Sequence, residues 1–102
     1  MAAAETALEA DLAEIMRTFE VCLDDARDRT TAVSNEGLRP RFFDAKADAC
    51  ARIRDANLSS AYSRAGIAAT QRERLAIEAD MAAMTNALLA DARADLGLLE
   101  TN

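Results

Sequence analysis

The chain has 102 residues, a formal net charge of −6 and no histidine. Alanine supplies 25 of these residues, against three glycines and one proline, and alanine favours helix over strand. The length allows one domain with a modest core, and an acidic chain without a sustained basic stripe is not expected to bind nucleic acid.

The N-terminal segment MAAAETALEADLAEI has neither a basic start nor an unbroken apolar run, so it does not resemble a signal peptide. No stretch approaches the roughly 18 apolar residues of a membrane-spanning helix. We therefore expect a cytoplasmic chain that does not interact with membranes.

An amphipathic pattern predicts a first helix over about residues 3–33. Apolar side chains recur at alternating steps of four and three, with one step missed at Arg29. At roughly 100° per residue these positions share one helix face, as in a coiled-coil-like contact. Met16 and Leu23 widen this stripe, which consists of Leu8, Leu12, Ile15, Phe19, Cys22, Ala26 and Val33.

The segment SNEGLRPRF separates the first helix from the second. Gly37 is placed to adopt the left-handed conformation that often follows a helix, and Pro40 suits a first helical turn. A second, short helix is predicted over residues 41–56. Beyond Ile53 the apolar positions move to another side, so residues 57–69 are predicted to be irregular. The predicted inner face of the second helix consists of Phe42, Phe43, Ala49, Cys50 and Ile53.

A capping box predicts the start of a third helix, over residues 70–98. In Thr70-Gln-Arg-Glu73 the threonine and glutamate side chains can each bond a free amide of the first turn. The predicted fold is therefore all-α, a long–short–long antiparallel hairpin or three-helix bundle. Leu89 lies at the edge of the apolar stripe of this helix, which consists of Ile77, Met81, Met84, Leu88, Ala92, Leu96 and Leu99.

The residue types argue against catalysis. Without histidine the chain lacks the commonest general base and metal ligand, and its two cysteines form no Cys-x-x-Cys motif. GIAATQR has neither the glycine spacing nor the lysine of a phosphate-binding loop. We expect a protein that is not an enzyme and has no cofactor and no metal site.

Cys22 and Cys50 are predicted to lie at the same level. In an antiparallel hairpin that turns near residue 36, Cys22 faces Cys50 and Phe19 faces Ile53. The pair could form a disulfide or redox latch, or remain two buried thiols that act as small hydrophobic side chains. A reducing cytoplasm favours the second alternative, and we predict reduced cysteines.

Two features of the helices suggest a partner surface. Met16, Met81 and Met84 could line an adaptable recognition groove, although methionines at helical spacing are more often core. A row of alanines follows the third helix opposite its large residues, where it could allow close approach of a partner helix or simply favour helix formation in solvent. The candidate partner-binding residues are Ala83, Ala87, Leu88, Leu89, Ala90, Ala94, Leu96, Leu98 and Leu99.

The helix pattern, with FFDAKADACARI in the second helix and NALLADARADLGLL at the end of the third, resembles flagellar export chaperones of the FlgN type. In that family an asparagine followed by paired and repeated leucines marks the last helix; here these are Asn86, Leu88, Leu89, Leu96 and Leu99. The resemblance implies a small, cytosolic, cofactor-free chaperone. Such a chaperone would bind hook–filament junction subunits before export by covering an amphipathic terminal helix of the client.

Two other functions fit the same sequence. A phage-encoded or regulatory inhibitor could use the acidic first and third helices to cover a basic surface of a target protein. A structural subunit could instead associate with its own copies, as a homodimer or a larger assembly. All three readings predict a protein partner.

Overall fold

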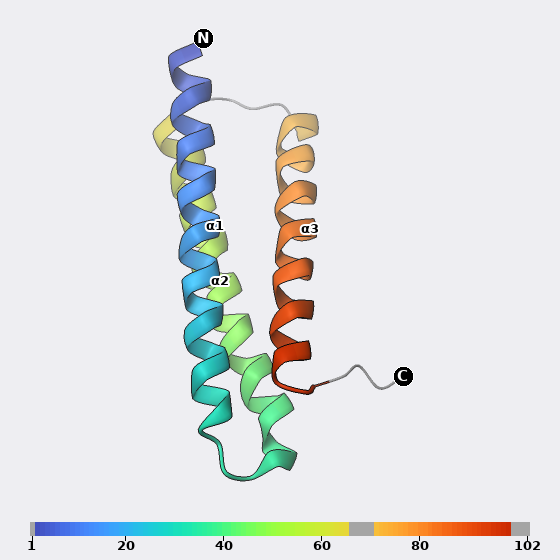
Figure 1. Cartoon of the computed structure of the whole chain (residues 1–102). Coiled ribbons are helices and arrows are strands. Elements are labelled where there is room, and N and C mark those ends of the chain that lie inside the picture. The colour runs from blue at the N-terminus through green and yellow to red at the C-terminus, as the bar shows by residue number, and fades with distance from the viewer. Residues whose placement is uncertain (1, 66–70, 99–102) are drawn as a thin grey trace.

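Three helices lie side by side in an elongated bundle, 52 Å along its longest axis (Figure 1). The computed structural model describes residues 2–65 and 71–98, with side chains over residues 8–64 and 72–98. The helices are α1 (Ala2–Thr31), α2 (Arg39–Ala65) and α3 (Gln71–Asp95), and a short 3-10 helix η1 (Glu36–Leu38) precedes α2. The described residues contain no strand, which confirms the predicted all-α fold. None of the described helices is long and apolar enough to cross a membrane.

The turn between α1 and α2 is held by side-chain hydrogen bonds. The Asn35 side chain accepts from the backbone amide of Gly37 at 3.0 Å. Arg39 Nε donates to the Val33 carbonyl oxygen at 2.9 Å, so the arginine satisfies a carbonyl that the helix end leaves free. The left-handed conformation predicted for Gly37 is wrong: of the described residues only Gly97 has a positive φ, 72°. Gly97 terminates α3 instead, where the Leu98 amide donates to the Arg93 carbonyl in a Schellman-type bond.

The second helix is longer than predicted, because α2 continues without a break to Ala65. The predicted irregular connection is therefore wrong over residues 57–65, and residues 66–70 lie outside the described residues. The predicted face followed Ile53, which is 50% exposed, whereas Arg54 occupies the inward position. With Arg54 included, the inner face keeps helical spacing throughout: Phe43, Ala47, Cys50, Arg54, Leu58 and Ala61.

The core has two clusters along the bundle axis. The first combines buried residues of all three helices: Phe19, Leu23, Ala26, Phe43, Ala47, Cys50 and Ala92. The second lies nearer the N-terminus of α1: Leu8, Ile15, Leu58, Ala61 and Met81. Thr30 is fully buried and its Oγ1 donates to the Ala26 carbonyl, so this threonine continues the α1 stripe beside the exposed Arg29.

The third helix turns a slightly different face inward from the one predicted. Met81, Thr85 and Ala92 are buried, whereas Met84 is 48% exposed. The helix also ends at Asp95, three residues before the predicted end. Thr70 of the predicted capping box lies outside the described residues.

Candidate partner-binding groove

The third helix runs in the same direction as α1 and opposite to α2 (Figure 1). Charged and polar side chains connect it to both helices. Arg27 of α1 pairs with Asp95 at 3.0 Å, and Arg93 pairs with Asp44 of α2. Near the middle, Arg54 Nη1 donates to Thr85 Oγ1 at 2.9 Å. These contacts hold α3 against the α1–α2 hairpin, and hollows lie along both flanks of α3.

On the α1 flank, two adjoining hollows of about 340 and 430 Å³ share Ala13, Met16 and Met84. We call their combined lining the α1–α3 groove. From Ile77 to Leu88 the groove follows eleven residue steps of α3, or roughly 16 Å, about three helical turns. Its lining consists of Leu12, Ala13, Met16, Arg17 and Glu20 on α1, and Ile77, Asp80, Met81, Met84, Ala87 and Leu88 on α3.

The three methionines meet in this groove. Met81 is buried, Met16 is half-buried, and Met84 leaves 48% of its surface exposed. Met81 is thus ordinary core, as methionines at helical spacing usually are, but Met84 presents its side chain to solvent beside Ala13. Methionine is flexible and polarisable, so this lining can adapt to apolar side chains of different shapes.

Carboxylates mark the edges of the groove. Arg17 is paired with Glu14 of the preceding turn, which neutralises the one base in the lining. Glu20 and Asp80 make no ion pair with any described residue. The groove therefore has an apolar floor and a net negative margin.

The predicted partner-binding residues lie in different places. Ala87 and Leu88 line the α1–α3 groove. Leu88 also packs against the first core cluster, as do Leu89, Leu96 and Leu98. The other candidate alanines are exposed on the outer side of α3: Ala83, Ala90 and Ala94. Leu99 lies outside the described residues.

Sequence reasoning found only part of the α1 wall of the groove. Met16 was named as a possible groove residue as well as a member of the apolar stripe, whereas Leu12 was assigned to the stripe alone and Ala13 was not singled out. The width of the apolar stripe of the first helix was the available signal for this wall, because Leu12 and Met16 lie on the side of the stripe that faces α3. A stripe of that width can contact two neighbouring helices, or one helix and an added partner.

The larger hollow on the α2 flank of α3 has a lining of both polar and apolar side chains. It measures about 490 Å³ and its lining includes Arg54, Tyr62 and Glu78. Arg54 bonds Asp55 and Thr85, and Arg74 lies over the Tyr62 ring at 5.0 Å from its centroid. Burial, and then the negative charge of Glu78, raise the pKa of the Tyr62 hydroxyl, and the nearby Arg74 opposes this shift. The Tyr62 hydroxyl oxygen is buried and makes no hydrogen bond with the described residues, so the polar groups of this hollow are not all paired within the bundle.

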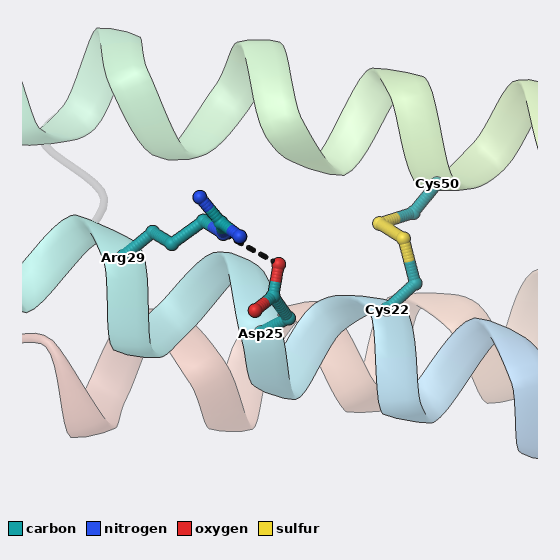
Figure 2. Close-up of a disulfide and its surroundings, with 4 residues drawn as sticks. All are labelled: Cys22, Asp25, Arg29 and Cys50. Atoms are coloured by element: carbon teal, nitrogen blue, oxygen red, sulfur yellow. Dashed lines mark hydrogen bonds and ion pairs between the residues drawn. A yellow bond between two sulfur atoms is a disulfide. The ribbon is translucent and has the colours of Figure 1, made fainter.

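A disulfide joins α1 to α2 through Cys22 and Cys50 (Figure 2). Their Cα atoms are 5.8 Å apart, which confirms the predicted antiparallel level of the two cysteines. The prediction of reduced cysteines is wrong for this structure. One turn further along α1, the Asp25 carboxylate pairs with Arg29 at 2.8 Å (Figure 2). Phe19 is buried as expected, but the half-exposed Ile53 is not its core partner.

The described residues contain no group of three or more histidine, cysteine or acidic side chains that could hold a metal ion. Comparison with known protein families, curated proteins and solved structures finds no match to the chain.

Proposed function

We propose that the chain is a non-enzymatic protein-binding module that takes one amphipathic helix of a partner protein into the α1–α3 groove. The observation that carries this proposal is the apolar floor of the groove, where Met16 and Met84 leave adaptable surface beside Leu12. A groove of about three turns suits partner side chains spaced at i, i+3 or i+4, and i+7. Each apolar side chain that becomes fully buried would contribute roughly 1.5–3 kcal/mol before the ordering costs of binding.

Within this class, the chain would act as a small cytosolic export chaperone. The resemblance of its helix pattern to FlgN-type chaperones supports this narrower proposal, and hook–filament junction subunits are then the clients to test. Occupation of the groove by the client's terminal helix would keep that helix from assembling before export. Cytosolic thiols are usually kept reduced, so the protein is to be assayed with the Cys22–Cys50 bridge both intact and reduced.

Site-specific photo-crosslinking tests the binding site. A photoreactive amino acid replaces Met84 in one variant and Ala79 in another, since Ala79 is exposed on α3 but outside the groove lining. With each hook–filament junction subunit of the source organism, we expect crosslinking from position 84 and none from position 79. Equal crosslinking from both positions would refute the groove as the site. Binding of other proteins but no junction subunit would refute only the chaperone assignment.

A second candidate, a charge-driven inhibitor of a basic target, is favoured by Glu20 and Asp80, which make no ion pair within the described part of the chain. Salt separates the two functions. At about 1 M salt the Debye length falls to roughly 3 Å, so a complex held by exposed charges should dissociate while an apolar groove contact persists.

A further inference from the structure

We propose that the α1–α3 groove selects a helix whose apolar face is flanked by lysine or arginine, and disfavours both acidic helices and a second copy of this chain. This inference rests on the proposed function and adds the charge of the partner to it.

Two carboxylates without an ion-pair partner among the described residues stand at the groove. Asp80 of α3 lines the hollow that also contains Leu12, and Glu20 of α1 lines the adjoining hollow with Leu88. The acids therefore stand on opposite walls and toward opposite ends of the groove. A helix lying along the floor would have one carboxylate beside it near each end.

Further exposed acids extend this negative margin along both helices. Asp91 follows Ala87 and Leu88 by one turn of α3, and Glu9 precedes Ala13 by one turn of α1. Neither acid makes an ion pair with a described residue. The basic side chain in the lining, Arg17, is already paired with Glu14.

Covering these acids costs free energy unless the partner supplies a positive charge. A docked helix removes water from the groove margin, so each carboxylate loses hydration unless a positive charge or a donor replaces it. Lysine or arginine can extend an aliphatic stem over the apolar floor and place its charge at the margin. Glutamate at the same place would add like-charge repulsion in a partly dehydrated site.

A second copy is disfavoured as the occupant. A symmetric contact through this groove would cover Asp80 and Glu20 of both copies, while the basic side chain of the lining, Arg17, is already paired with Glu14 in each copy. Each copy also carries a net charge of −6, so the approach of two copies is opposed over a longer range at low salt.

Two synthetic peptides test the inference. Both are amphipathic helices of about four turns with identical leucine positions on the apolar face, and the flanking positions are lysine in one and glutamate in the other. Binding to the full chain is measured by fluorescence anisotropy at low and high salt. We expect the lysine peptide to bind at least about tenfold more tightly at low salt, and the difference to shrink as salt screens the charges.

Charge reversal supplies the matched variants. Asp80→Lys and Glu20→Lys should each weaken the preference, and together they should reverse it. Asp48→Lys, which makes the same change of charge as either single variant, should leave the preference unchanged, because Asp48 is exposed on α2 outside the α1–α3 groove. Circular dichroism confirms that each variant is folded. Equal binding of both peptides, each abolished by Met84→Asp, would overturn the charge inference and leave the proposed function standing. Binding of neither peptide would overturn both. Self-association in sedimentation that Met84→Asp abolishes would identify a second copy as the occupant and overturn the inference.

Discussion

The guanidinium of Arg54 lies over the ring of Phe19, with its central carbon 5.4 Å from the ring centroid. This cation–π contact joins α2 to α1 between the two core clusters, and the same guanidinium bonds Thr85 of α3. One side chain thus links all three helices at a position where an apolar residue would be expected.

Replacing Arg54 should therefore weaken the whole bundle. Arg54→Ala removes the contact with Phe19 and leaves the buried Thr85 hydroxyl without its partner, so we expect the free energy of unfolding to fall by about 1–3 kcal/mol. Urea denaturation measures this loss. The exposed neighbour Arg52 is the control, and Arg52→Ala should change stability by less than about 0.5 kcal/mol.

Phe19 should contribute more to stability than any exposed apolar residue of the same helix. Phe19→Ala empties a site that is only 2% exposed, and we expect a loss of about 3–5 kcal/mol in urea melts. Val21, which is 63% exposed, is the matched position, and Val21→Ala should cost under about 0.5 kcal/mol. Similar losses at both positions would mean that α1 is rotated from the face described.

The disulfide should stabilise the hairpin through the unfolded state. Its cysteines are 28 residues apart, and closing a loop of that length corresponds to about 3.5 kcal/mol in the chain-entropy account. We expect reduction to lower the free energy of unfolding by up to this amount, as measured by urea melts with and without a thiol reductant. The double variant Cys22→Ala, Cys50→Ala should be insensitive to the reductant. Identical melts of the oxidised and reduced wild-type chains would contradict a bridge that constrains the hairpin.

Two alanines of α3 separate the groove from the outer face. Ala87 lines the groove and Ala90 is exposed outside it. Ala87→Arg should weaken binding of the lysine-flanked peptide by about tenfold or more, because it obstructs the groove and adds a positive charge beside the lysines. Ala90→Arg should leave binding intact and change stability by no more than about 0.5 kcal/mol. The opposite ranking would place the partner on the alanine row.

Tyr62 gives the bundle a pH dependence at the alkaline end. Burial and Glu78 raise the pKa of its hydroxyl, so the folded chain retains this proton to higher pH than the unfolded chain, whose tyrosine titrates near 10. The contribution of this proton to stability is complete below the pKa that Tyr62 has in the unfolded chain. It is lost as the pH rises through the higher pKa that Tyr62 has in the folded chain. Ultraviolet titration of the phenolate should show the raised pKa, and Glu78→Gln should lower it. An unchanged titration in that variant would exclude Glu78 as a cause.

The sequence predicts what helical spacing can determine, and α1 is the clearest case. Leu8, Ile15 and Phe19 are buried as their spacing indicated. The prediction for α2 failed because only apolar side chains were taken as markers of the inner face. Ile53 was therefore placed inward, although it is half-exposed, and Arg54 was missed. The partners of Arg54, the Phe19 ring and the Thr85 hydroxyl, come from other helices. In the third helix, Met84 was predicted to face the core, but the neighbouring Thr85 is buried there instead. The sequence does not show that the Thr85 hydroxyl has a hydrogen-bond partner, Arg54, on another helix.

The candidate groove could be predicted only in part. Periodicity singled out the methionines and leucines of the third helix, but a stripe does not show whether the flank between two helices is closed by side chains or left open. The level of the two cysteines followed from hairpin geometry. Their oxidation could not follow from it, because thiols at the same spacing pack equally well when reduced.

Because of the Cys22–Cys50 bridge, α1 is joined more strongly to α2 than to α3. The bridge fastens α1 to α2, whereas the groove opens between α1 and α3, whose ion pair Arg27–Asp95 is reversible. Separating α1 from α3 would break only non-covalent contacts such as Arg27–Asp95, whereas separating α1 from α2 would also require reduction of the disulfide. The cross-linked α1–α2 hairpin would then be the more rigid part of the bundle, and a change in the width of the groove would come from movement of α3.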